Sequence, residues 1–165
     1  MIIGCSGSGK TTLAMKLSKK LSLPLVHLDK LYWTGRWETV DGEEFNAMVL
    51  KEMEKDKWII DGNYNRSIPQ RLKYCDTVIY LDFSRWTCLL GVINRVIKSY
   101  GKTRPDMGGD CTERFDLDFM KFVWNFNKKN RERYLVMLKN SEDKRIIILH
   151  NRRECDEFLR DCEYI

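Results

Sequence analysis

The sequence predicts an α/β fold in which helices cover both faces of a five-stranded parallel β-sheet. Three observations support this prediction. Apolar runs of strand length recur along the chain, segments with helical spacing separate them, and the runs are apolar throughout rather than alternating. Strands of that kind are buried on both faces, which is typical of parallel sheets. We therefore expect three layers, with the strands in the order 2-3-1-4-5.

Five apolar segments are the expected strands: residues 1–3, 23–28, 58–60, 77–81 and 146–149. The first is Met-Ile-Ile, and the last is Ile-Ile-Ile-Leu. Pro24 stands at the start of the second segment, where the missing N–H group of proline is tolerated.

Between these segments, apolar residues recur at helical spacing, so we expect a helix after most strands. The first carries Leu13, Leu17 and Leu21. Polar capping residues open two others, Asp41 with Glu44 and Asn151 with Glu154, and a long helix follows Ser84. A further helix carries the apolar residues Phe119, Phe122, Val123, Phe126, Tyr134, Met137 and Leu138.

Composition restricts the class of protein. The 165 residues contain 43% hydrophobic and 32% charged residues, with a net charge of +5, which is ordinary for a folded soluble chain. We expect one domain over residues 1–165, a cytoplasmic location, and neither a membrane span nor a signal peptide. Six cysteines without C-x-x-C spacing favour reduced, packed thiols over a zinc site.

The segment between the first strand and the first helix is rich in glycine. Residues 4–11, Gly-Cys-Ser-Gly-Ser-Gly-Lys-Thr, match the P-loop pattern G-x-x-x-x-G-K-[ST] in full. In such a loop, successive backbone N–H groups and the helix N-terminus hold phosphate groups. We expect ATP, or GTP, to be bound by Gly4, Ser6, Gly7, Ser8, Gly9, Lys10, Thr11 and Thr12. Lys10 would contact the outer phosphates and Thr11 would bind Mg²⁺.

Three of the apolar runs end in aspartate: Asp29, Asp61 and Asp82. The carboxyl ends of parallel strands meet at one edge of a sheet, where ligands bind. One of these carboxylates would hold Mg²⁺, and another would accept the proton of an attacking hydroxyl group. Each aspartate is also compatible with a purely local role in a turn, and the spacing alone leaves the roles open.

A resemblance assigns some of these roles. Residues 58–70, Trp-Ile-Ile-Asp-Gly-Asn-Tyr-Asn-Arg-Ser-Ile-Pro-Gln, resemble the LDGFPRT-x-x-Q segment of adenylate kinases, and the order of motifs is similar to the nucleoside and nucleotide kinase superfamily. The strings at 27–33 (His-Leu-Asp-Lys-Leu-Tyr-Trp), 61–64 (Asp-Gly-Asn-Tyr) and 101–105 (Gly-Lys-Thr-Arg-Pro) more closely resemble bacterial DNA topology modulation (FlaR-like) proteins. The resemblance covers nearly the whole chain and implies a P-loop NTPase fold.

The resemblance implies that Asp61 is the acid beside Mg²⁺, that Arg66 grips an acceptor phosphate, and that Arg95 faces the transferred phosphoryl group. Asp29 resembles the base of kinases that phosphorylate hydroxyl groups. Residues 63–65, Asn-Tyr-Asn, replace the Phe-Pro pair of adenylate kinases, so acceptor specificity does not carry over.

Residues 101–116 break all periodicity, and we expect a short lid over about 99–116. Arg95, Lys98, Lys102 and Arg104 flank or enter it, so its closure would deliver cations and exclude water. Arg104 is similar to the lid arginine of small-metabolite kinases. The four-ligand zinc lid of some adenylate kinases is missing, since Cys111 stands alone in this segment.

Aromatic residues follow the second strand, where related kinases receive the acceptor. With Asp29, we take Tyr32 and Trp33 as acceptor-binding candidates, although such rings serve equally well to close a core.

The resulting hypothesis is an ATP- and Mg²⁺-dependent kinase that acts on a nucleoside, a nucleotide or another small metabolite. One alternative is a nucleotide-binding regulator that affects DNA topology through its basic surface, although no recognisable nucleic-acid-binding module is present in the sequence. A second alternative is a plain NTPase without a specific acceptor.

Overall fold

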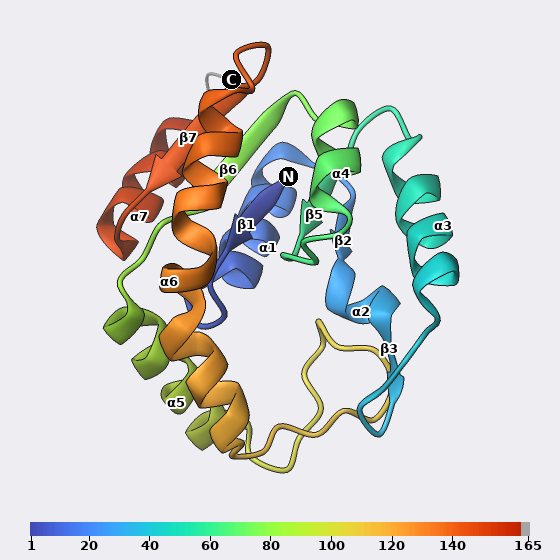
Figure 1. The fold of residues 1–165 in the computed structure, drawn as a ribbon, viewed down its shortest axis with the longest axis vertical. Coiled ribbons are helices and arrows are strands. Elements are labelled where there is room, and N and C mark those ends of the chain that lie inside the picture. Colours follow the sequence, from blue (N-terminus) through green and yellow to red (C-terminus); the bar gives the residue numbers. More distant parts are fainter. Residues whose placement is uncertain (163–165) are drawn as a thin grey trace.

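The computed structural model describes residues 1–162, in which five parallel strands form a central sheet (Figure 1). They are β1 (Ile2–Gly4), β2 (Leu25–His27), β5 (Ile59–Asp61), β6 (Thr77–Leu81) and β7 (Arg145–Leu149). Their order is β2-β5-β1-β6-β7. Strands β3 (Trp33–Gly35) and β4 (Glu38–Thr39) form a separate hairpin, so the five sheet strands taken in chain order follow the predicted arrangement 2-3-1-4-5.

Helices lie on both faces of the sheet, as predicted (Figure 1). They are α1 (Lys10–Leu21), α2 (Leu28–Tyr32), α3 (Gly42–Met53), α4 (Ile68–Tyr74), α5 (Arg85–Ser99), α6 (Leu117–Lys139) and α7 (Arg152–Asp161). In residues 1–162, no helix has both the length and the apolar character needed to cross a membrane.

The sequence missed two helices and the hairpin. The expected second strand, 23–28, is shorter than predicted, because Leu28 begins α2 and is fully buried beneath α3. Helix α4 and the hairpin of β3 (Trp33–Gly35) and β4 (Glu38–Thr39) carry no clear period of apolar residues. Asp29 therefore lies in a helix rather than in a turn after the strand.

Polar side chains cap the predicted helix starts. Asp41 accepts a hydrogen bond from the backbone N–H of Glu43, Ser84 from that of Thr87, and Asn151 from that of Glu154. These bonds satisfy N–H groups that have no partner inside the helix, which fixes where each helix begins.

The core has two parts. The larger surrounds β1 and β6, and Tyr80 of β6 packs edge-on against Tyr134 of α6. The smaller joins α2 and α3 to the other side of the sheet through Leu28, Val49 and Ile60. Trp58, which directly precedes β5, packs against both parts.

Candidate active site

A cavity of about 610 Å³ opens over the glycine loop at the carboxyl ends of β1, β2 and β5. The loop lines it with residues 6–12, and other elements contribute His27, Asp29, Asp61, Arg95, Arg104 and Asp106. The parallel sheet explains this convergence, because each of these strands delivers the residues that follow it to the same edge.

The glycine loop is pressed against α5. A Cβ atom on Gly7 would lie 2.1 Å from the carbonyl oxygen of Cys88, and the φ angle of Gly7 is 81°. Gly91 of α5 makes the reciprocal approach, since its Cβ would lie 2.1 Å from the Gly7 carbonyl oxygen. Only glycine fits this backbone contact, which holds the loop in place without any ligand.

Gly4 has a different position from the rest of the loop. Its N–H donates to Oδ1 of Asn63 at 3.0 Å, and a Cβ there would lie 2.7 Å from the carbonyl oxygen of Leu81. Gly4 thus packs between β5 and β6, and the cavity lining begins at Ser6.

Three buried polar atoms that belong to the cavity residues have no hydrogen-bond partner within the described part of the chain: Ser8 Oγ, Asp61 Oδ1 and Arg104 Nε. Of these, Arg104 Nε still has an ion-pair contact, 3.1 Å from Glu113 Oε2. Nearly all buried polar groups in folded proteins are paired, so such exceptions indicate a group that a ligand or ordered solvent completes. Lys10 Nζ bonds to the Cys5 carbonyl oxygen at 3.1 Å, which folds the ammonium group back onto the loop.

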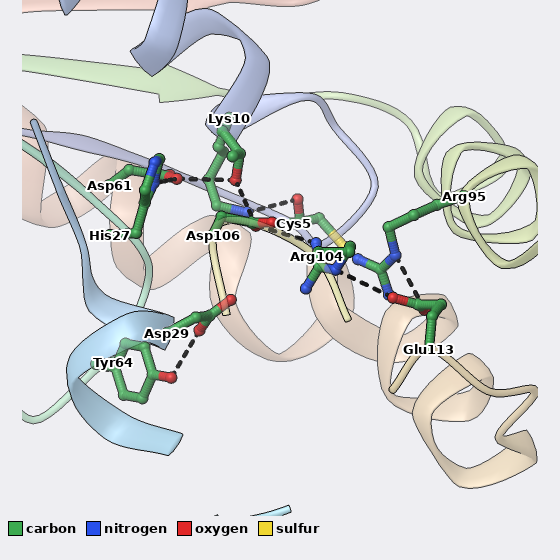
Figure 2. Close-up of polar contacts among 11 residues, drawn as sticks. Cys5, Lys10, His27, Asp29, Asp61, Tyr64, Arg95, Arg104, Asp106 and Glu113 are labelled. Atoms are coloured by element: carbon green, nitrogen blue, oxygen red, sulfur yellow. Dashed lines mark hydrogen bonds and ion pairs between the residues drawn. The ribbon is translucent and has the colours of Figure 1, made fainter. Parts of the chain in front are cut away.

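The Asp61 carboxylate is held beside the start of α1. Its Oδ2 accepts from the Thr11 hydroxyl at 2.9 Å and lies 3.2 Å from Nδ1 of His27 (Figure 2). His27 was not predicted as a site residue, although it directly precedes the Leu-Asp pair that ends the second apolar run.

These residues fit a Mg²⁺ ion. Thr11 and Asp61 offer oxygen donors, which Mg²⁺ prefers, and Asp61, whose buried Oδ1 has no partner, lines the same cavity. Among residues 1–162, no group of three or more His, Cys, Asp or Glu side chains is arranged to hold a metal alone. Such a set suits an ion that shares its remaining positions with phosphate oxygens and water.

Arg95 and Arg104 reach the cavity from α5 and from the 101–116 segment. Glu113, which is buried, joins them: its Oε1 accepts from Arg95 Nε and Nη2 at 3.1 and 2.9 Å, and its Oε2 lies 3.1 Å from Arg104 Nε (Figure 2). Burial and the neighbouring Arg104 charge lower the pKa of Arg95. The sequence analysis missed Glu113, because nothing in an aperiodic segment marks which acid will be buried.

The 101–116 segment has no helix or regular strand, as expected, yet it is packed against the hairpin. A Cβ on Gly108 would lie 1.9 Å from the Trp33 carbonyl oxygen, and the Trp37 N–H donates to Cys111 Sγ at 3.4 Å. Figure 1 shows the segment passing beside β3. Trp33 thereby contributes a backbone contact to the segment.

Asp29 forms a separate contact on the α2 side of the cavity. The Tyr64 hydroxyl donates to its Oδ1 at 2.6 Å (Figure 2). Burial and the Asp29 charge raise the pKa of Tyr64, so the phenol remains a donor at neutral pH. This bond holds one carboxylate oxygen of Asp29 and turns the residue toward the cavity that it lines.

Two predicted acceptor residues, Tyr32 and Arg66, line a second cavity of about 910 Å³ rather than the first. Tyr32 packs edge-on against Phe45 and Trp33, and its centroid lies 4.8 Å from that of Tyr64. Arg66 is exposed at the end of this second cavity. Asp29 therefore lines the cavity of the glycine loop, whereas Tyr32 and Arg66 line only the second cavity.

The third strand-end acid, Asp82, is occupied elsewhere. It accepts from Arg131 Nε and Nη2 of α6 at 2.8 to 3.0 Å, and it does not line the cavity of the glycine loop. Of the three strand-end aspartates, only Asp29 and Asp61 therefore remain candidates for binding Mg²⁺ or accepting a proton in this cavity.

A buried arginine that the sequence analysis missed shapes the segment after β5. Arg71 donates to the carbonyl oxygens of Gly62 and Asn63 and to Ser67 Oγ. Its burial lowers its pKa to about 10. By fixing this turn, Arg71 positions Asn63 against the glycine loop and Tyr64 against Asp29.

The fold is similar to that of a solved kinase structure. The chain superimposes on the 1.7 Å crystal structure of shikimate kinase from Bacteroides thetaiotaomicron with a TM-score of 0.58, covering 99% of this chain and 94% of that one. The sequences are 15% identical, so the likeness concerns the fold. No protein-family model and no curated protein matches the chain.

Proposed function

We propose that this protein transfers the γ-phosphoryl group of ATP to the hydroxyl or phosphate oxygen of a small acceptor. The observation that carries the proposal is the pair of buried, unpartnered oxygen atoms, Ser8 Oγ and Asp61 Oδ1, inside a cavity walled by a full P-loop motif. The likeness in fold to a kinase supports a small-molecule acceptor. The resemblance to FlaR-like proteins offers a closer relationship but no acceptor.

In this proposal the chain acts by positioning charges. The glycine loop and Lys10 hold the β- and γ-phosphates, and Thr11 with Asp61 holds a Mg²⁺ ion, which would neutralise developing charge. The acceptor oxygen attacks the γ-phosphorus as the bond to the β-phosphate oxygen breaks. Asp29 accepts the proton of an acceptor hydroxyl, and the 101–116 segment acts as a lid that carries Arg104 and excludes water.

The test is ADP release from ATP or GTP across a panel of nucleosides, nucleotides and other small hydroxyl compounds, with Mg²⁺ present. We expect at least one acceptor to accelerate release and to gain 80 Da, and Lys10→Ala to abolish both. Steady hydrolysis that no acceptor accelerates would instead indicate a plain NTPase. No turnover with any member would count against the proposal.

A further inference from the structure

The 101–116 segment brings a carboxylate to the phosphate end of the cavity. Asp106 is 7% exposed, and its Oδ2 lies 3.4 Å from Thr11 Oγ1 and accepts from Arg104 Nη1 at 3.0 Å. Asp61 Oδ2 lies 2.9 Å from the same hydroxyl oxygen of Thr11. Two carboxylates from distant parts of the chain, Asp61 and Asp106, therefore lie within reach of the Thr11 hydroxyl group.

Within residues 1–162, Arg104 is the cation paired with Asp106, whereas Asp61 Oδ1 has no partner. The Thr11 hydroxyl has a single proton and can donate it to only one of the two carboxylates. Asp61, which is 4% exposed, keeps an unpartnered Oδ1 in the same cavity. Arg104 offsets part of the repulsion between the two carboxylates, and an ion that both can bind would offset more of it.

We propose that Asp106 is a third protein donor, with Thr11 and Asp61, to a divalent-cation site that is complete only when the lid is closed. All the donors are oxygen atoms, which suits Mg²⁺ or Mn²⁺. The proposal rests on the proposed function in placing nucleotide phosphates at the remaining positions of the ion. The proposal also makes closure of the lid depend on the metal. Without the ion, the negatively charged Asp106 would lie against negatively charged phosphate oxygens.

A simpler role for Asp106 is to orient Arg104, to which it is paired. The two roles predict opposite effects of losing Asp106 on nucleotide binding in the absence of metal. If Asp106 only orients Arg104, its loss weakens phosphate binding with or without metal. If Asp106 binds the cation, its loss weakens metal binding. The same loss removes a negative charge that repels the nucleotide phosphates when no metal is present, so metal-free nucleotide should bind no more weakly.

The experiment is a titration of the intact protein with Mn²⁺, followed by electron paramagnetic resonance, with and without a β,γ-imido analogue of ATP. With the analogue present, Asp106→Asn should raise the Kd for Mn²⁺ by about 10-fold or more, the range typical of groups that support a bound metal. Asp110→Asn removes the same charge from an exposed position of the same segment and should stay within about twofold of wild type.

The second measurement is binding of the analogue in the presence of EDTA. Asp106→Asn should bind it as tightly as wild type or tighter, which also shows that the variant is folded, whereas Arg104→Gln should bind it more weakly. An Asp106→Asn variant with unchanged Mn²⁺ affinity would overturn the inference. So would one that loses metal-free binding as Arg104→Gln does.

The two proposals fail separately in this design. If the analogue binds but Asp106→Asn leaves the Mn²⁺ titration unchanged, the metal inference is wrong and the proposed function stands. If Asp106→Asn weakens Mn²⁺ binding while wild type binds no analogue, the cation site stands and the proposed function fails. Absence of any Mn²⁺ binding overturns the cation site.

Discussion

The glycine loop and the 101–116 segment both line the cavity, but their polar groups are in opposite states. In the loop, Ser8 Oγ is buried without a partner, and the Asp61 carboxylate beside it keeps one free oxygen. In the segment, the cation of Arg104 is already paired with Asp106 and Glu113. To contact a phosphate, Lys10 of the loop must leave only the Cys5 carbonyl oxygen, whereas Arg104 must exchange two carboxylate partners.

This difference separates binding from turnover. A preformed site loses little conformational freedom when the ligand enters, so the loop should determine nucleotide affinity. A segment whose charges are neutralised internally adds little to the first encounter and acts after closure. Substitutions in the two regions should consequently change different kinetic constants.

The largest effect expected in the segment is that of Arg104→Ala. An arginine at a phosphoryl-transfer transition state contributes about 10³–10⁵ in rate, so kcat should fall by at least about 10³-fold. The Kd for the ATP analogue should rise by no more than about 10-fold. Steady-state kinetics with calorimetry measures both constants, and Lys102→Ala, an exposed cation of the same segment, is the control.

Asp29→Asn tests the α2 side of the cavity. Loss of a general base costs about 10²–10⁴ in rate, and we expect a kcat decrease near 10²-fold for a hydroxyl acceptor with nucleotide affinity unchanged. Tyr64→Phe keeps the carboxylate and removes only its hydrogen bond, so a smaller loss should follow. Equal losses for the two variants would mean that Asp29 serves only to hold Tyr64.

Glu113→Gln should uncouple the two arginines. Without the carboxylate, Arg95 and Arg104 repel each other, and the segment loses a buried ion pair. We expect a roughly 10-fold lower kcat and a free energy of unfolding lower by about 2 kcal/mol, from thermal denaturation. Asp118→Asn, an exposed acid nearby, should change neither quantity.

Gly108→Ala should have the smallest effect. Its methyl group would meet the Trp33 carbonyl oxygen, so the segment would dock less closely on the hairpin. Because the substitution does not touch the glycine loop, we expect only a several-fold decrease in kcat/KM. Gly101→Ala is the control variant. A Cβ at Gly101 has open space, although its positive φ angle adds local strain. A change in nucleotide affinity larger than that in turnover would contradict the separation of the two regions.

The sequence predicted the sheet order and the glycine loop because both depend on local patterns. Uniformly apolar strands identify a parallel sheet, and the P-loop motif determines its own backbone shape. It missed Glu113, Asp106 and Arg71, since the role of each depends on contacts across the fold rather than on neighbours in the chain. Asp82 and Asp61 both follow an apolar run, but in the structure Asp82 pairs with Arg131 of α6, whereas Asp61 bonds to Thr11 and lines the cavity.

The expected acceptor residues show the same limit. Tyr32 and Arg66 were expected beside Asp29 at the acceptor, but they line a second cavity together with Tyr64. An aromatic cluster has no period from which its orientation can be deduced. Its members pack with Phe45 of α3, a helix whose position depends on the smaller core.

The central claim is that the glycine loop holds the phosphates of a nucleoside triphosphate. Calorimetric titration with the β,γ-imido analogue of ATP and Mg²⁺ tests it most directly, with Lys10→Ala and the exposed Lys19→Ala as a matched pair. We predict one saturable site in wild type and Lys19→Ala, and at least about 10-fold weaker binding in a folded Lys10→Ala variant. Equal affinity in all three proteins, or no binding at millimolar analogue, would contradict the account.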